Sequence, residues 1–188
     1  MYRYFEKDKK EFEYLDKFSN LEKQLENGFF KEAFTIEEII LPNKIICSDL
    51  ENPKISLEIK NSLKEIIKDS IKIFKENGLN NSIDTHGLIE YHYYENAKIM
   101  PLAIHVDDFG GVNYKVNTII YYLDKTVEGG NLEIYKNHKT LQEIIDVKPS
   151  KNKIKILVME GNILHNVSQI KSNGIRECIV VQLLCFRN

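Results

Sequence analysis

The stretch "YKVNTIIYYLD", residues 114–124, is the part of the sequence that decides the fold. β-Branched and aromatic side chains fill it, and these residue types are enriched in β-strands. Similar runs lie on both sides, separated by turn segments such as "DDFGG", "EGGN" and "KSNG". The sequence therefore predicts that the second half of the chain is built from short strands.

Eight candidate strands with short connections follow one another after residue 80. They cover residues 86–95, 100–108, 114–124, 131–137, 143–149, 153–160, 162–170 and 176–186. No long helix lies between them, which argues against a doubly wound parallel sheet. The spacing fits an antiparallel barrel or a jelly roll.

The first part of the chain shows a helical pattern. Apolar residues recur every three or four positions over residues 8–27 and, more clearly, over residues 54–77. Pro53 suits the start of the second helix, and Gly78 suits the position just past its end. Between the two helices, residues 33–50 predict a short helix followed by an extended piece.

The length of 188 residues favours a single domain over residues 1–188. Within it we expect mostly helical support from residues 1–80 and a strand core over residues 81–188. The net charge of −2 leaves no general electrostatic footprint for nucleic acid. No apolar run is long enough to span a membrane, and the N-terminus lacks the apolar region of a secretory signal.

Three widely spaced cysteines, Cys47, Cys178 and Cys185, form neither a disulfide framework nor a CxxC zinc pair. We expect them to be reduced and mostly buried. Reduced thiols are typical of a cytoplasmic protein, which is the location we predict.

His105 and Asp107 lie two residues apart in the apolar run "PLAIHVDD". Residues two apart in a strand point to the same face. If His165, in the run "NILHNV", faces the same side, then two imidazoles and one carboxylate converge. This is the 2-His-1-carboxylate set of non-haem Fe(II) oxygenases, which leaves open positions on the metal.

Each of these residues also has an ordinary interpretation. An H-x-D tripeptide is common as a hydrogen-bonded surface pair, and a lone buried histidine is more often a core residue. Arg176, eleven positions after His165, favours the metal site. An arginine inside a barrel needs an anionic partner, and its planar fork suits a carboxylate. The remaining histidines have no such neighbours in the sequence: His86, His92 and His138.

In this order, the motifs resemble the core of the Fe(II)/2-oxoglutarate-dependent dioxygenases, and most closely the prolyl 4-hydroxylase-like branch. The motifs are H-x-D at 105–107, "YYLD" at 121–124, "GGNLEI" at 129–134, "HNV" at 165–167 and "GIR" at 174–176. The resemblance covers about residues 86–187. It implies an α+β fold with a mainly β core, a double-stranded β-helix (jelly roll) with supporting N-terminal helices.

The resemblance also implies roles for single residues. His105, Asp107 and His165 would be the catalytic metal ligands. Arg176 and Tyr122 would hold the distal carboxylate of 2-oxoglutarate. The candidates for lining the same pocket are Thr118 and Ile120, which share the strand face of Tyr122, and one of Tyr93 and Tyr94, of which we take Tyr93.

The implied reaction is hydroxylation of a C–H bond in a peptidyl residue, coupled to oxidative decarboxylation of 2-oxoglutarate to succinate. It uses Fe(II), 2-oxoglutarate and O₂, and ascorbate is a candidate reductant. Hydroxylation of a free amino acid or another small metabolite is the alternative.

Two further classes are disfavoured. Nucleic-acid demethylases typically carry a second arginine shortly after the position of Arg176, and this chain does not. A noncatalytic metal-binding jelly roll would leave Arg176 without a purpose. Asp108 and the Gly110-Gly111 pair remain either a substrate-side loop or a plain turn.

Overall fold

The computed structural model describes residues 1–20, 29–37, 44–47, 57–79, 83–95, 103–108, 111 and 113–186. The elements of the first half are β1 (Tyr2–Asp8), the 3-10 helix η1 (Lys9–Asn20), β2 (Phe29–Glu37), β3 (Lys44–Cys47), α1 (Leu57–Glu76) and β4 (Ile83–Glu95). Those of the second half are β5 (Tyr114–Lys125), β6 (Leu132–Asn137), β7 (Thr140–Ile145), β8 (Lys153–Glu160), β9 (His165–Val167) and β10 (Ile175–Phe186).

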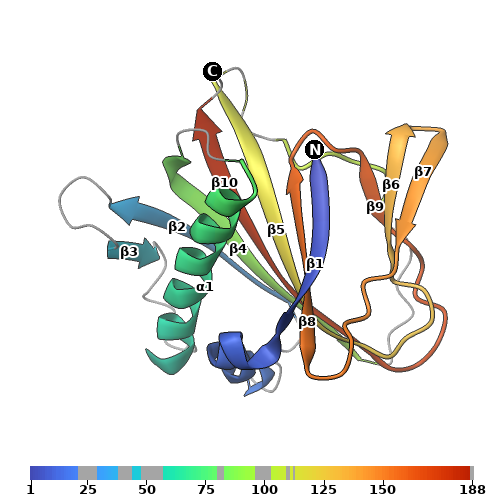
Figure 1. Ribbon diagram of the computed structural model, residues 1–188, viewed down its shortest axis with the longest axis horizontal. Helices are drawn as coiled ribbons and strands as arrows, with labels where there is room; N and C mark the ends of the chain where they lie inside the picture. The colour runs from blue at the N-terminus through green and yellow to red at the C-terminus, as the bar shows by residue number, and fades with distance from the viewer. Residues whose placement is uncertain are drawn as a thin grey trace.

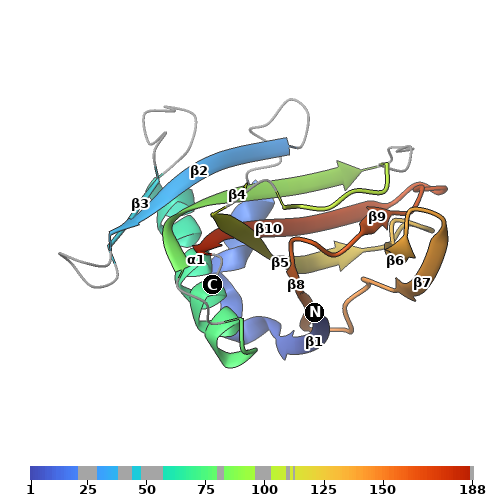
Figure 2. The ribbon, with the colours of Figure 1, turned by 90° about the horizontal axis from the view of Figure 1, so that it is seen from above.

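The strands form two antiparallel sheets. The large sheet has the order β1-β8-β5-β10-β4-β2-β3, and the small sheet has the order β7-β6-β9. The helices and the small sheet lie on opposite sides of the large sheet (Figures 1 and 2). This arrangement confirms the predicted jelly roll with a mainly β core.

The alternation of side chains along β5 produces two separate cores, one on each face of the large sheet. Ile119 and Tyr121 point to the helix side. Ile120 and Tyr122 point to the space between the two sheets. The residues of β5 from Val116 to Tyr122 are all buried, so this strand reads as a nearly continuous apolar run.

The helix predicted over residues 54–77 is confirmed as α1. Its buried face carries the predicted apolar stripe, which includes Leu63, Ile66, Ile67 and Phe74. The helix ends where Gly78 takes a φ of +75°, and the Leu79 N–H donates to the Phe74 carbonyl at 3.0 Å. Within the ranges given above, no helix combines the length and apolarity needed to cross a bilayer.

The first eighty residues contain more strand than we expected. Residues 2–8 form β1, which the pattern did not indicate, and residues 33–37 belong to β2 instead of a short helix. Among the described strands, β1 is an edge strand that pairs only with β8, and its charged side chains face solvent, which hides the β pattern in the sequence. The first predicted helix is a 3-10 helix over residues 9–20, and its continuation lies outside the described residues.

The strand expected over residues 100–108 is also wrong in its described part. Residues 103–108 make a single β-bridge, between His105 and His165, and are otherwise irregular. β9 is likewise only three residues long. The other predicted strands are confirmed, with shifted ends, as β4, β5, β6, β7, β8 and β10.

Candidate active site

The two histidines of the predicted metal site are bound to each other through their backbones. The His105 N–H donates to the His165 carbonyl at 3.0 Å, and the His165 N–H donates back to His105 at 2.9 Å. Such a pair in an antiparallel bridge puts both side chains on the same side. The imidazole rings accordingly lie 4.3 Å apart between centroids.

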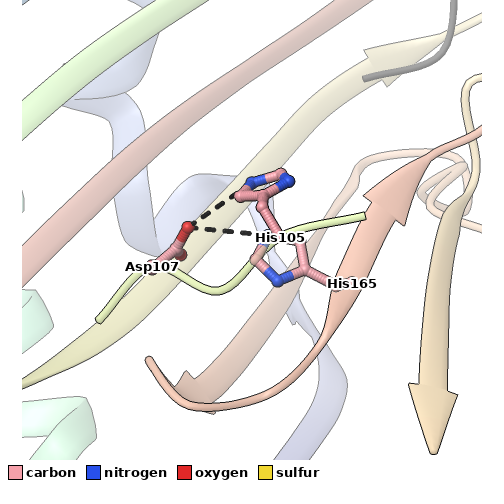
Figure 3. A group of neighbouring side chains, drawn as sticks. All are labelled: His105, Asp107 and His165. Atoms are coloured by element: carbon pink, nitrogen blue, oxygen red, sulfur yellow. Dashed lines mark ion pairs between the residues drawn. The ribbon is translucent and has the colours of Figure 1, made fainter. Parts of the chain in front are cut away.

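Asp107 completes the cluster from the irregular segment that follows His105 (Figure 3). Its Oδ1 lies 3.7 Å from Nε2 of His105 and 3.6 Å from Nε2 of His165. The three ligand atoms lie within 4.8 Å of one another, so the three predicted ligands do converge.

The hydrogen bonds of the rings make this donor set suitable for a metal ion. Nδ1 of His105 is 2.8 Å from the Ala103 carbonyl, and Nδ1 of His165 is 2.9 Å from the Ile163 carbonyl. A carbonyl only accepts, so each Nδ1 carries the proton and each Nε2 presents its lone pair to the cluster. Burial lowers the pKa of His165, which favours the neutral ring that a metal requires. Two neutral imidazoles and a carboxylate fit Fe(II).

Thr118 has a different task from the one predicted. It lies on the predicted face of β5 and is fully buried, but its hydroxyl donates to Oδ2 of Asp107 at 2.7 Å. It is not among the residues that line the cavity described below. Thr118 therefore orients the carboxylate and leaves Oδ1 facing the two imidazoles.

Arg176 and Tyr122 form a second polar site. Arg176 is 4% exposed, and among the described residues no carboxylate pairs with it. Its Nε donates to the Gly130 carbonyl at 3.0 Å, and its Nη1 lies 3.5 Å from Sγ of Cys178, a thiol whose pKa burial raises. Among the residues that the structure describes, the buried Tyr122 hydroxyl has no hydrogen-bond partner. A buried cation beside an unpaired donor is an arrangement that suits a carboxylate ligand.

One cavity of ≈ 180 Å³ joins the two sites. Its lining includes the metal cluster together with Arg176, Tyr122, Tyr94 and Ile120. The prediction that Tyr93 lines the cavity was wrong, because its side chain points to the other face of the sheet. Tyr93 packs against the core on the helix side, and its neighbour Tyr94 faces the cavity, because consecutive strand residues point to opposite faces.

Four polar residues of the lining were not predicted from the sequence: Glu90, His92, Ser168 and Gln182. Nε2 of His92 lies 3.0 Å from Oε2 of Glu90, so His92 does belong to a cluster. Both residues precede Tyr94 in steps of two on β4. Residues two apart in a strand point to the same face, so Glu90 and His92 could have been predicted to face the cavity once Tyr94 was known to do so.

A tight turn before β6 positions Arg176. Gly129 and Gly130 have φ values of +79° and +64°. A Cβ on Gly129 would lie 1.9 Å from the Gln169 carbonyl oxygen, and one on Gly130 would lie 3.0 Å from Cδ of Arg176. The "GG" pair is therefore needed for the close approach of this turn to the arginine.

Comparison with known proteins agrees with this geometry. The family model described as "2OG-Fe(II) oxygenase superfamily" matches residues 89–182. That segment holds the three cluster residues and Arg176. No curated protein sequence matches the chain.

Several solved structures share the fold. IDO from Bacillus thuringiensis has a TM-score of 0.58 at 13% identity, covering 98% of this chain and 93% of that one. A Pseudomonas putida prolyl-4-hydroxylase has a TM-score of 0.53 at 10% identity, with the same coverages of 98% and 93%. A Trichoplax adhaerens prolyl hydroxylase in complex with a hypoxia inducible factor peptide fragment has a TM-score of 0.53 at 15% identity, covering 97% and 83%.

Proposed function

The chain belongs to the 2OG-Fe(II) oxygenase superfamily, and from this premise we propose that it hydroxylates a C–H bond of a peptidyl residue, as a prolyl hydroxylase does. Membership of the family makes the protein a non-haem iron dioxygenase. The cofactor set that the family implies is Fe(II) with 2-oxoglutarate and O₂. Ascorbate remains a candidate reductant within the proposal.

One observation carries the assignment of the site. Arg176, buried and without a carboxylate partner among the described residues, shares a cavity with His105, Asp107 and His165. A dicarboxylate can meet a metal at the cluster and the guanidinium at the other end. This is the placement that 2-oxoglutarate needs.

In this proposal some residues bind the metal ion and the co-substrate, and others keep water out of the cavity. His105, Asp107 and His165 would hold Fe(II), with Thr118 fixing the carboxylate. Fe(II) together with 2-oxoglutarate and O₂ supplies the oxidising chemistry when bound. Arg176 and Tyr122 bind the distal carboxylate of the co-substrate. The apolar part of the cavity lining keeps water from this region: Ile120, Leu132, Val167, Ile170 and Val180.

The size of the cavity supports a substrate that reaches in from outside. A volume of ≈ 180 Å³ is below the roughly 300–1,000 Å³ of pockets that enclose drug-sized ligands. His105 is 39% exposed and Val106 is 41% exposed, so the metal cluster lies close to the surface. A side chain presented by a peptide can reach it there.

Relatives with the same fold add support for this substrate class. Two of them are prolyl hydroxylases, and one of these is bound to a peptide fragment. A free amino acid or another small metabolite would use the same metal cluster and is the alternative outcome of the test below. A nucleic acid substrate is disfavoured by the net charge of −2. The proposed cytoplasmic location is in keeping with the free, buried thiols of Cys178 and Cys185.

The proposal is tested by a screen for succinate release with Fe(II), 2-oxoglutarate and ascorbate against proline-containing peptides and free amino acids. We expect a peptide hit whose product gains one oxygen by mass spectrometry. His105→Ala should abolish the Fe(II)-dependent release, because the ion loses one of three ligands. Glu128→Gln, an exposed residue outside the cavity, is the control.

Two results would count against the proposal. Full activity of His105→Ala would remove this cluster from the reaction. Oxygen insertion into free amino acids, without any into peptides, would replace the peptidyl substrate by the small-molecule one.

A further inference from the structure

The inner faces of β4 and its neighbour β10 carry a second polar region that the mechanism above does not use. We call it the polar wall, and it consists of Glu90, His92 and Gln182. All three line the cavity. The side chains of Glu90 and His92 are 16% and 21% exposed, so they are accessible from the mouth without being free in solvent.

The strand register places the Gln182 end of the polar wall beside the metal cluster, while His92 lies opposite Cys178, next to the arginine. Gln182 lies opposite Thr118, the residue that holds Asp107. Glu90 lies opposite Val180, one step of two residues along β10 from Gln182. Further along β10, Arg176 pairs with Tyr94. A substrate carbon at the metal would therefore have the Gln182 end of the polar wall at its side.

The chemistry of the polar wall defines what it can bind. An ionised glutamate only accepts hydrogen bonds, and it repels other anions in a site of low dielectric. The co-substrate entering the same cavity is already a dianion. A carboxylate next to that site favours a ligand that brings positive charge and N–H donors, and it disfavours an acidic one.

From this we propose that the polar wall binds a cationic group of the substrate, an ammonium or a guanidinium, next to the carbon that is oxidised. The inference rests on the proposed function and narrows its substrate class to basic peptides. Glu90 accepts from the cation. His92, at 3.0 Å, orients the Glu90 carboxylate toward the cavity.

Binding of matched probes to the enzyme loaded with Fe(II) and 2-oxoglutarate under argon tests the inference without turnover. The probes are capped peptides with a central proline next to lysine, norleucine or glutamate, and free L-lysine and L-norleucine. Calorimetry should show the lysine probe binding about tenfold tighter than the norleucine probe, and glutamate weakest. Glu90→Gln should bring lysine and norleucine close to parity.

One further variant serves as the control. Glu128→Gln removes an equal charge outside the cavity and should keep the preference of the unmodified protein. Affinity for Fe(II) should be the same in Glu90→Gln and Glu128→Gln as in the unmodified protein, which shows that each variant is folded.

The outcomes separate this inference from the proposed function. Equal binding of lysine and norleucine probes, an unchanged preference in Glu90→Gln, or no lysine probe binding below about 1 mM would each overturn the inference. Succinate release is then measured in air. Turnover of free L-lysine without any of the peptides would refute the peptidyl substrate and keep the polar wall. Turnover of the norleucine peptide as fast as that of the lysine peptide would refute the role of the polar wall and keep the peptidyl substrate.

Discussion

Each imidazole of the metal cluster uses one nitrogen for a backbone carbonyl and presents the other to Asp107. The backbone thereby selects the tautomer that can bind a metal. Asp107 is oriented in a similar way, because the Thr118 hydroxyl donates a hydrogen bond to one of its two carboxylate oxygens. At the residue scale, the site is organised before any ion enters.

Thr118 offers a direct test of this organisation. Thr118→Val keeps the shape and removes the hydroxyl, so Oδ2 of Asp107 loses its donor. Affinity for Fe(II), titrated without oxygen, should fall about 10- to 100-fold, as for other residues that support metal ligands. Thr118→Ser keeps the donor and should stay close to the unmodified protein. Equal affinities in Thr118→Val and Thr118→Ser would contradict the role.

Arg176 is expected to affect the co-substrate and not the metal. Arg176→Gln removes the charge that faces the distal carboxylate. The 2-oxoglutarate concentration needed for half-maximal succinate release should rise by at least about tenfold, because hydrogen bonds to charged groups contribute about 1.5–3 kcal/mol. Fe(II) affinity in the absence of 2-oxoglutarate serves as the control and should not change. An unchanged 2-oxoglutarate requirement would remove Arg176 from this role.

At the scale of elements, β5 connects the site to the core between the large sheet and helix α1. One face of β5 carries Tyr122 into the cavity, and the other carries Tyr121 into the core under α1. The Ser70 hydroxyl lies 2.7 Å from the Ile66 carbonyl, to which it donates, and 2.8 Å from the Tyr121 hydroxyl. Tyr121 is therefore the donor of the second bond. The helix holds the sheet through a buried hydrogen bond as well as apolar contacts.

This buried bond predicts a measurable loss of stability. Ser70 and Tyr121 are both fully buried, so Ser70→Ala leaves the tyrosine hydroxyl without its acceptor. The free energy of unfolding in urea should fall by about 1–3 kcal/mol. The double variant Ser70→Ala with Tyr121→Phe removes both partners and should recover part of the loss. A double variant that is less stable by the sum of the single losses would contradict this explanation.

At the scale of the whole molecule, β1 brings the two sheets together at one edge. The Tyr2 hydroxyl donates to the Glu143 carboxylate of β7, and the Tyr4 hydroxyl donates to the same group at 3.2 Å. β1 itself pairs with β8 in the large sheet. We propose that residues 1–188 form a single domain, because strands from both halves of the chain share the large sheet.

The link between the sheets gives a pH-dependent prediction. The hydrogen bond to Glu143 raises the pKa of Tyr2 from 10.0 to about 12. The neutral phenol is therefore favoured in the folded state. Its contribution to the free energy of unfolding is fully present below pH 10 and is lost as the pH rises through about 12. Tyr2→Phe should lower the free energy of unfolding by up to about 1 kcal/mol at neutral pH.

The measurement is urea unfolding of Tyr2→Phe and the unmodified protein at several pH values. The difference in stability between them should shrink between pH 10 and pH 12. A difference that stays constant over this range would show that the Tyr2 hydroxyl does not carry it. Tyr4→Phe, which loses the weaker bond, is the comparison variant.

Part of the site could be predicted from the sequence, because the spacing and order of its motifs are visible there. The spacing of His105 and Asp107, and the order in which His165 and Arg176 follow, indicated the cluster and its cationic partner. Tyr93 was chosen wrongly because a run of adjacent tyrosines has no parity signal of its own. The direction of Tyr94 depends on the pairing of β4 with β10.

The sequence by itself determined the strands of the core, the helix α1 and the types of the metal-binding side chains, because periodicity and side-chain chemistry are properties of neighbouring residues. The tertiary structure decided the rest. His105 and Asp107 converge with His165 through one backbone bridge and one threonine, in a segment that is not a strand. Glu90 and His92 line the same cavity from β4. Contacts between distant segments depend on register and loop path, which no local pattern specifies.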